Sequence, residues 1–440
     1  PQAVAGLTLW QKLHEVLAND SEHPVAGDAP VTNMVRARII RYDRKGRPEG
    51  RIIEILERRK APIIGRLLHE NGMWLVAPED RRYGQDILIP KNATASAAAG
   101  QVVAVELTEP PSMYSQPVGR VTEVLGQIDD PGMEIEIAVR KYEVPHRFSP
   151  ETLAQAAALP DKLRPVDMKH RVDLTDVPLV TIDGEDARDF DDAVWCQRTR
   201  GGGYKLLVAI ADVASYVKPG SALDDEAQKR GTSVYFPQRV VPMLPERLSN
   251  GICSLKPEVD RLCLVCEMRI DAQGETTRSR FFPAVMRSAA RLTYTQVWQA
   301  VGERREDVRA QVAKVLPELE SLYALYQLLA RRRGERGALD FEGQEVRFSF
   351  DEQGQIDAVR PYQRNDAHRL IEECMIAANV AAAKFLKRSK IPTLYRVHPR
   401  PPIHKYEELQ EFMASVGMPI PAYEDLQPED LMGILRRAKS

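Results

Sequence analysis

The chain has 440 residues, a formal net charge of −2 and five cysteines. This length is enough for roughly two to four domains with their own cores. No apolar run reaches the length of a membrane span, and no secretory leader is visible at the N-terminus. An odd number of scattered cysteines argues against a disulfide framework. We therefore expect a cytoplasmic protein with no membrane attachment.

Charge is distributed unevenly along the chain. Residues 36–60 contain ten lysines and arginines against four acidic residues, whereas residues 183–192 are strongly acidic. A basic module beside an acidic site suits an enzyme that acts on a polyanion. Chance clustering of charges on a solvated face explains the composition about equally well.

Residues 35–128 are predicted to form short β-strands. The expected strands are 35–40, 50–56, 63–68, 73–77, 86–89, 102–107 and 119–125. Asn71-Gly72 between two apolar runs is a strong hairpin signal. Strands at this spacing predict a small barrel, and an OB-type barrel would bind nucleic acid. The lysine, arginine, tyrosine and tryptophan residues on these strands fit that use, although any small barrel carries some of them.

Residues 145–440 are predicted to mix strands and helices. Strands are expected at 177–182, 193–195, 206–213 and 262–268, with another ending at Val285. A helix is expected to start near Thr293, continue through the apolar pattern at 315–329 and stop at Gly334 and Gly337. A second helix is expected at 366–386. The CxxC pair at 263 and 266 falls inside a strand, so we expect it to belong to the core.

The most informative segment is an acidic run between two apolar strand-like segments. Six carboxylates lie within ten positions, at Asp183, Glu185, Asp186, Asp189, Asp191 and Asp192. Two like charges about 4 Å apart repel by roughly 4 kcal/mol at an effective dielectric constant near 20. A divalent cation with oxygen ligands would neutralise them.

An EF-hand calcium loop is one alternative for this run. It requires glycine at its sixth position and glutamate at its twelfth. Counting from Asp183, these positions hold Arg188 and Val194, and counting from Asp186 they hold Asp191 and Gln197. The EF-hand is therefore excluded, and a two-metal phosphodiester site fits better.

Residues 181–193 (TIDGEDARDFDDA) resemble the signature of the ribonuclease II/ribonuclease R family of 3′→5′ exoribonucleases. Further collinear segments agree with that family at 207–217, 231–237, 242–251, 364–375 and 395–398, and their wording is closest to its ribonuclease R branch. The resemblance covers about residues 35–425.

The resemblance implies a multidomain α+β fold. N-terminal OB-type (cold-shock) barrels would be followed by a mixed α/β ribonuclease II-type catalytic domain that is truncated in its C-terminal part. The implied domains are 1–60 with a partial first cold-shock barrel, 61–130 with the second barrel, a linker at 131–172, and the catalytic domain at 173–440. The family's later arginine segment, which holds the scissile phosphate, is not found before Ser440. We therefore expect the chain alone to be weakly active or inactive.

The resemblance also implies roles for single residues. Asp183, Asp189, Asp191 and Asp192 match the family's active-site aspartates and would hold Mg²⁺, with two ions expected per site. Asp183 and Asp192 are expected to be direct ligands and Asp191 to be critical for catalysis. The other two acidic residues of the run are expected to be solvated bystanders.

Three further residues match positions that bind RNA in the family. Tyr235 and Phe341 match aromatic residues that stack on the 3′ end of the RNA. Glu372 matches an acidic residue at the terminal nucleotide, where a carboxylate could accept a hydrogen bond from a ribose 2′-hydroxyl.

The implied function is a processive, Mg²⁺-dependent 3′→5′ exoribonuclease that releases nucleoside 5′-monophosphates. Its substrate would be single-stranded RNA with a free 3′ end, and the ribosome and other RNA-decay factors are candidate partners. We expect a monomer. Two alternatives stay open, a non-catalytic RNA-binding scaffold with the same fold and a metal-dependent DNA nuclease.

Overall fold

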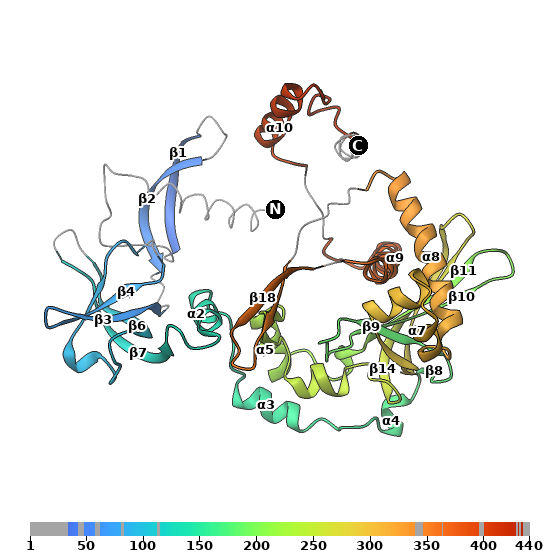
Figure 1. Cartoon of the computed structure of the whole chain (residues 1–440), viewed down its shortest axis with the longest axis horizontal. Helices are drawn as coiled ribbons and strands as arrows, with labels where there is room; N and C mark the ends of the chain where they lie inside the picture. The colour runs from blue at the N-terminus through green and yellow to red at the C-terminus, as the bar shows by residue number, and fades with distance from the viewer. Residues whose placement is uncertain are drawn as a thin grey trace. The chain divides into compact units, whose positions relative to one another are not determined.

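The structure is a computed structural model that describes residues 34–42, 48–57, 62–80, 83–111, 115–338, 346–362, 364–395, 400–427, 430 and 433. The described residues form two compact units (Figure 1). The first unit takes in the described residues up to His146, together with Val234–Val241 and Phe348–Ala358. The second unit contains the others.

The first unit contains a closed five-stranded barrel with strand order β3-β4-β5-β7-β6. Its strands are β3 (Ile63–Glu70), β4 (Met73–Pro78), β5 (Ile87–Ile89), β6 (Gln101–Glu109) and β7 (Val118–Gln127). All pairs are antiparallel except β5 with β7. This is the Greek-key closure of an OB-fold, so the predicted barrel is confirmed.

The predicted hairpin at Asn71-Gly72 joins β3 and β4. Both turn residues have positive φ, 51° and 80°, as this kind of tight turn requires. The register it sets turns Leu67 and Val76 into the barrel, where both are fully buried. Alternation along the two strands therefore fixes the barrel core.

Further elements of the first unit flank this barrel. Helix α2 (Met133–Lys141) packs Met133 and Ile137 against Ile64, Val102 and Ala104 of the barrel. A separate two-stranded sheet is formed by β1 (Met34–Tyr42) and β2 (Pro48–Glu57). Two short strands, β12 (Val234–Tyr235) and β13 (Val240–Val241), form another hairpin. A single 3₁₀ turn, η2, spans Lys91–Ala93.

The second unit is built on a seven-stranded sheet with the order β16-β9-β10-β11-β14-β15-β8. The strands are β8 (Val172–Leu174), β9 (Val180–Asp183), β10 (Asp192–Arg198), β11 (Tyr204–Ala211), β14 (Asp260–Ile270), β15 (Thr276–Arg287) and β16 (Ala290–Thr293). The central pairs are antiparallel and the two edge pairs are parallel. The strands predicted at 177–182, 206–213 and 262–268 are confirmed, with small shifts at their ends.

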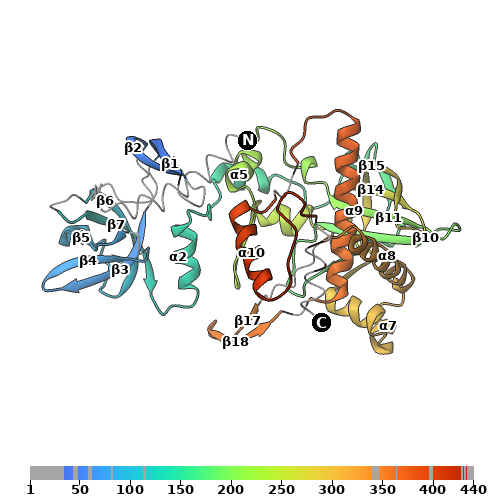
Figure 2. The ribbon, with the colours of Figure 1, turned by 90° about the horizontal axis from the view of Figure 1, so that it is seen from above.

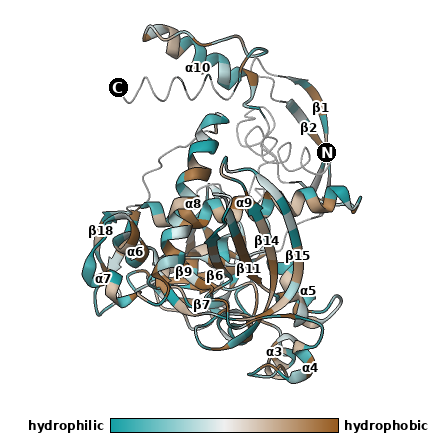
Figure 3. Ribbon diagram, turned by 90° about the vertical axis from the view of Figure 1, so that its right-hand side faces the viewer, coloured by the Kyte–Doolittle hydropathy of each residue, from teal (hydrophilic) through white to brown (hydrophobic). Residues whose placement is uncertain are grey.

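Both faces of this sheet are covered. One face packs against α8 (Leu316–Glu335) and α9 (Asp366–Arg388), which lie beside β10, β11 and β14 in Figure 2. The other face packs against apolar side chains from α3 (Pro150–Ala157), α5 (Ala222–Arg230) and residues 244–255. Figure 3 shows the hydrophobic stretches of β11 and β14 between these layers. Burial on both faces explains why the strands are nearly continuous apolar runs.

The remaining helical elements of the second unit are short. They are α3 (Pro150–Ala157), α4 (Pro165–Met168), η3 (Val213–Ser215), α5 (Ala222–Arg230), η4 (Leu248–Ile252), α6 (Tyr294–Val297), η5 (Trp298–Gly302), α7 (Glu306–Gln311) and α10 (Ile403–Ser415). A two-stranded hairpin, β17 (Val346–Phe350) with β18 (Ile356–Pro361), has its turn in the first unit. None of the described helices is long and apolar enough to cross a membrane.

The helix predicted to run from Thr293 to Gly334 is in fact several elements. The capping box at Thr293 and Gln296 is confirmed, but α6 ends at Val297 and gives way to a wide turn. Pro317 lies in the first turn of α8 and starts a new helix, since proline lacks an N–H for a preceding turn. Helix α8 then continues through Gly334 and ends before Gly337, whose φ is +73°. The helix predicted at 366–386 is confirmed as α9.

Cys263 and Cys266 lie in β14, where both thiols are buried and free. All five cysteines of the chain are buried. The core assignment of the CxxC pair is therefore confirmed.

Candidate active site

The two ends of the acidic run lie at neighbouring strand ends. Asp183 is the last residue of β9 and Asp192 is the first residue of β10. The two strands are antiparallel neighbours, paired at Val180 and Val194. The loop 184–191 therefore leaves the sheet and returns to the same edge, which brings Asp183, Asp191 and Asp192 close together.

These carboxylates repel one another in a poorly solvated place. Burial, followed by the negative charges of Asp192, Asp189 and Asp191, raises the pKa of Asp183 to about 7. Burial and the charge of Asp191 raise the pKa of Asp192 to about 6. Burial and the charge of Asp189 also raise the pKa of Asp191. The ionised forms are disfavoured chiefly because the carboxylates are partly buried, and in addition because their charges repel one another.

One carboxylate oxygen in this group lacks a hydrogen-bond partner. Oδ2 of Asp183 is buried and has no hydrogen-bond partner among the described residues. A buried carboxylate oxygen of this kind fits a hard divalent cation, which prefers oxygen ligands. Asp183, Asp191 and Asp192 are therefore suitable donors for Mg²⁺.

The donors are near one another without converging on one point. In the described part of the chain, no three histidine, cysteine or carboxylate side chains are gathered tightly enough to form a preassembled metal site. Burial raises the pKa values of Asp183 and Asp192 most, and the neighbouring carboxylates raise them further. Mutual repulsion of like charges favours such a spread arrangement. The metal-ligand roles of the four aspartates stay a prediction.

Arg291 on β16 holds the start of the acidic loop. Its Nη2 donates to the backbone oxygens of Gly184 at 2.9 Å and Glu185 at 2.7 Å. Its guanidinium carbon lies 5.6 Å from the ring centre of Phe190. Arg291 also acts to lower the pKa of Asp183, against the larger effects that raise it. The sequence analysis missed this residue, although β16 pairs with β9 and places Thr293 opposite Asp183.

The other side of the loop is fixed by the segment at 254–255. Ser254 Oγ accepts a hydrogen bond from the backbone N–H of Phe190 at 3.0 Å and donates to the backbone oxygen of Arg188 at 3.2 Å. The backbone N–H of Leu255 donates to the oxygen of Phe190 at 2.8 Å. The ring of Phe190 is buried. The backbone between Asp189 and Asp191 is thus anchored by packing and by hydrogen bonds.

Glu185 and Asp186 are compensated, in contrast to the aspartates. Thr295 Oγ1 donates to Glu185 Oε1 at 2.6 Å, and Arg347 Nη1 lies 3.8 Å from Glu185 Oε2. The Thr295 hydroxyl, with Arg347 as a further cause, lowers the pKa of Glu185. Arg347 also pairs with Asp186, which is largely exposed. This arrangement supports their assignment as bystanders.

Tyr294 is a neighbour of the aspartates that the sequence analysis did not identify. Burial, then the charges of Asp183 and Asp192, raises the pKa of its phenol to about 12. Its ring stacks on His368, with ring centres 4.0 Å apart. The N-terminal turn of α9 thus lies next to the acidic loop.

Glu372, one turn further along α9 than His368, forms ion pairs with two arginines. Arg333 Nη1 donates to Glu372 Oε1 and to Glu373 Oε1, both at 2.9 Å. Arg364 forms an ion pair with the other oxygen of Glu372. Arg333 thus bridges two carboxylates, and Arg364 supplies a second positive charge. The RNA contact of Glu372 stays a prediction.

Of the two predicted stacking residues, the structure describes Tyr235 alone. Tyr235 lies on β12 of the first unit and is 66% exposed. The aspartates belong to the second unit. Phe341 lies outside the described residues. The stacking roles of Tyr235 and Phe341 stay predictions.

Comparisons with known proteins agree with the fold. The RNB domain family matches residues 171–439 and the cold shock domain family matches residues 75–149. The chain is 46% identical over 403 residues to ribonuclease R of Escherichia coli, covering 92% of this chain and 49% of that protein. It is 47% identical over 309 residues to ribonuclease R of Acidithiobacillus ferrooxidans, covering 70% of each.

A solved structure gives the same result. Mycoplasma genitalium RNase R, in complex with ribose methylated single-stranded RNA, matches with a TM-score of 0.84 and 26% identity, covering 95% of this chain and 66% of that chain. The chain spans about half the length of the Escherichia coli protein. Since the RNB match alone takes in more than half of the sequence, and the collinear motifs agree, the chain belongs to the ribonuclease R family.

Proposed function

We propose that the protein is a Mg²⁺-dependent, processive 3′→5′ exoribonuclease that hydrolyses single-stranded RNA to nucleoside 5′-monophosphates. The observation that carries this proposal is the set of partly buried aspartates with raised pKa values on a ribonuclease R fold. Asp183 keeps a buried oxygen without a hydrogen-bond partner among the described residues, and the pKa values of Asp183, Asp191 and Asp192 are raised. Perturbed carboxylates of this kind are typical of catalytic sites.

In this proposal Asp183 and Asp192 bind the cation directly, while Asp189 and Asp191 complete the ligand set. Bound Mg²⁺ would supply the positive charge that activates water and stabilises the leaving oxygen in phosphodiester hydrolysis. Arg291 keeps the loop backbone in place, because it holds two carbonyl groups of the turn after β9. The site is thus built on strand ends and a braced loop, as precise positioning of ligands requires.

The RNA would be held by aromatic and polar side chains. Tyr235 presents an exposed aromatic ring, and base stacking on such rings does not depend on sequence. Phe341 is proposed as its stacking counterpart. Glu372 is proposed to contact the terminal ribose. Its carboxylate oxygens are paired with Arg333 and Arg364, so one oxygen would have to accept from the ribose as well as from an arginine. The Mycoplasma genitalium relative bound to single-stranded RNA supports RNA as the substrate class.

Asp191→Asn tests this proposal. In the full natural protein with Mg²⁺, we expect release of mononucleotides from 3′-labelled RNA to fall by about a thousandfold, a loss at the upper end for one electrostatic catalytic group. RNA affinity, measured by fluorescence anisotropy, should change by less than about threefold. Unchanged cleavage would contradict the proposal. A wild-type protein that binds RNA without cleaving it would favour the scaffold alternative.

Matched RNA and DNA oligomers test the remaining alternative. RNA should be degraded faster than DNA of the same sequence, because only RNA offers a 2′-hydroxyl to a carboxylate such as Glu372. Glu372→Gln should narrow this ratio while cleavage of RNA persists. Equal rates on both wild-type substrates would instead support a DNA nuclease.

A further inference from the structure

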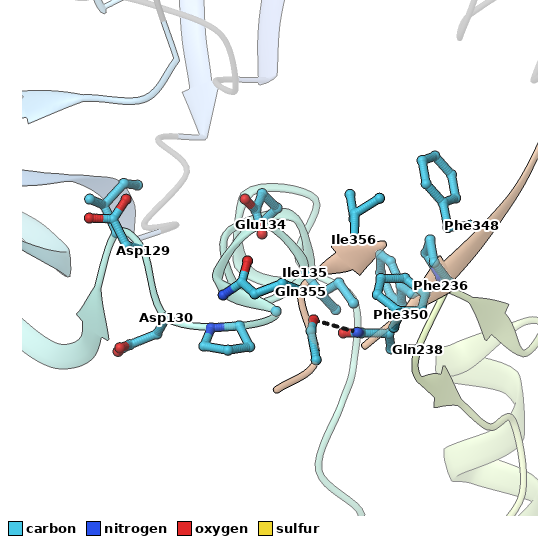
Figure 4. A pocket seen from close by; sticks show the side chains of 15 residues that line it. Asp129, Asp130, Glu134, Ile135, Phe236, Gln238, Phe348, Phe350, Gln355 and Ile356 are labelled. Atoms are coloured by element: carbon cyan, nitrogen blue, oxygen red, sulfur yellow. Dashed lines mark hydrogen bonds between the residues drawn. The ribbon is translucent and has the colours of Figure 1, made fainter. Parts of the chain in front are cut away.

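The first unit contains a groove with a volume of about 540 Å³. It is lined by three segments that are distant in sequence, residues 128–135 at the start of α2, residues 236–238 between β12 and β13, and the hairpin residues 348–356. A hydrogen bond from Gln238 Nε2 to the backbone oxygen of Gly354, 2.9 Å long, joins two of these segments. Figure 4 shows this bond at the bottom of the groove.

One end of the groove is aromatic. The phenyl rings of Phe236, Phe348 and Phe350 gather there, next to Ile356 (Figure 4). All three rings are partly exposed, so packing within the unit does not bury them completely. Partly exposed aromatic rings that share one hollow are typical of a binding site.

The other end of the groove is acidic. Asp129 and Asp130 lie on the side away from the rings in Figure 4, and Glu134, in the first turn of α2, lies between them and the rings. Among the described residues that line the groove there is no lysine or arginine. Arg239, which follows one lining segment, pairs instead with Glu136. The groove therefore combines aromatic faces with three exposed carboxylates, of which Asp130 also accepts a hydrogen bond from the backbone N–H of Gln127 at 2.7 Å.

This combination argues against RNA as the occupant. Sites for single-stranded nucleic acid pair aromatic rings with a positively charged groove that follows the phosphates. Here three carboxylates would repel the phosphates, and no lining cation would attract them. An occupant that brings its own positive charge and apolar side chains is complementary to both ends.

We propose that this groove binds an arginine-bearing, apolar segment of a partner protein. Arginine side chains of such a segment can pair with Asp129 or Glu134 at one end of the groove and lie on the faces of the phenyl rings at the other. Apolar side chains next to it would cover Phe348 and Ile356. Because none of the aspartates of the acidic loop lines the groove, this inference is independent of the proposed exoribonuclease activity.

A defined peptide tests the proposal. The probe is a fluorescein-labelled octapeptide of alternating arginine and leucine, titrated with the full natural protein and followed by anisotropy. Asp129→Asn with Glu134→Gln should weaken binding about tenfold. The control removes two exposed carboxylates from the same unit outside the groove, by Glu79→Gln with Glu109→Gln, and should change the affinity less than about twofold.

Two more arms separate charge from apolar burial. A peptide with citrulline in place of arginine should bind about tenfold more weakly, because it keeps the shape and loses the charge. Phe348→Leu should weaken binding of the arginine peptide more than that of the citrulline peptide, because only arginine gains from a ring face. A far-ultraviolet circular dichroism melt confirms folding of each variant.

Three results would overturn the proposal. The first is equal binding of the arginine and citrulline peptides, and the second is equal weakening by the groove variant and the control variant. The third is an oligouridylate decamer that displaces the peptide and loses affinity in the Phe348→Leu variant, which would identify RNA as the occupant.

Discussion

Two acidic regions of the second unit differ in whether arginine side chains pair with their carboxylates. In the loop after β9, Asp183 and Asp192 have raised pKa values, and Oδ2 of Asp183 is buried without a partner among the described residues. On α9, Glu372 and Glu373 are adjacent in sequence, and Arg333 donates hydrogen bonds to both of them. In the second region the carboxylates are paired with an arginine of the protein. In the first region a bound metal ion could supply the positive charge.

The difference separates an acidic site that can take up a cation from one that the chain neutralises itself. Adjacent carboxylates occur in both places, at Asp191 and Asp192 and at Glu372 and Glu373, so adjacency in the sequence does not distinguish them. What distinguishes them is whether the fold delivers an arginine to the side-chain oxygens. Near Asp183 the fold does deliver Arg291, but its hydrogen bonds go to backbone oxygens of Gly184 and Glu185.

The largest effect on stability should come from removing the arginine that pairs with Glu372 and Glu373. Arg333→Met leaves the carboxylate of Glu373, whose side chain is 7% exposed, without its ion pair. Breaking a buried pair in this way should lower the free energy of unfolding by about 3 kcal/mol, measured by urea denaturation. The neighbouring exposed residue serves as the control, and Arg331→Met should cost less than about 0.5 kcal/mol. Equal losses in both variants would contradict the bridging role.

Adding Glu373→Gln to Arg333→Met should recover part of this loss. The amide keeps the shape of the side chain and removes the buried charge that Arg333 compensates. No recovery would show that packing of the arginine, and not its charge, is what matters at this position.

A smaller effect is expected when the loop loses its brace. Arg291→Met removes the donors to Gly184 and Glu185, so the loop can depart from the geometry that gathers the aspartates. Affinity for Mn²⁺ should fall about tenfold, equivalent to about 1.4 kcal/mol, and amides 184–190 should exchange hydrogen faster. Arg278→Met, at an exposed position of β15, is the matched control. Unchanged exchange in the Arg291 variant would refute the brace.

The uncompensated charge should also be visible in stability against pH. The folded-state pKa of Asp183 is about 7, above the value near 3.9 of an unfolded chain. The folded state therefore binds more protons between these values, and stability falls as pH rises from about 4 to 7. With metal chelated, Asp183→Asn should be the more stable protein at pH 8.

After an allowance for solvent screening, this gain should be on the order of 1 kcal/mol at pH 8 and should vanish near pH 4. Urea denaturation at both pH values measures it. A variant that is less stable than the wild type at pH 8 would contradict the assigned sign.

The smallest effect is expected at the bystander Asp186. Its pair with Arg347 is exposed on both sides, so it should contribute less than about 1 kcal/mol to stability. Asp186→Asn should change affinity for Mn²⁺ less than about threefold, as measured by calorimetry. A loss as large as that of Asp183→Asn would make Asp186 a ligand and would remove the distinction drawn within the acidic run.

Much of the fold could be predicted from local patterns. Asn71-Gly72 marked the first barrel hairpin, and apolar runs marked β9, β11 and β14. The positions of Asp183 and Asp192 at strand ends followed from the apolar segments on either side. Periodicity could not reveal the break after Val297, because the apolar spacing continues across it.

The arginines that contact the acidic residues could not be predicted from local sequence patterns. Arg291 meets the acidic loop from a position 106 residues beyond Glu185, through a parallel strand pairing that no short pattern encodes. Arg333 similarly finds Glu372 only when α8 and α9 pack together. Long-range contacts of this kind depend on topology, and so does the compensation of charge.

The most direct test of the central claim is a Mn²⁺ titration followed by electron paramagnetic resonance. The wild-type protein should bind Mn²⁺ with a Kd below about 100 μM, and Asp183→Asn with Asp192→Asn should weaken binding more than tenfold. Glu372→Gln should leave the Kd within about twofold, because its carboxylate is already neutralised by arginines. Loss of Mn²⁺ binding in the Glu372 variant, with binding intact in the double aspartate variant, would contradict the account.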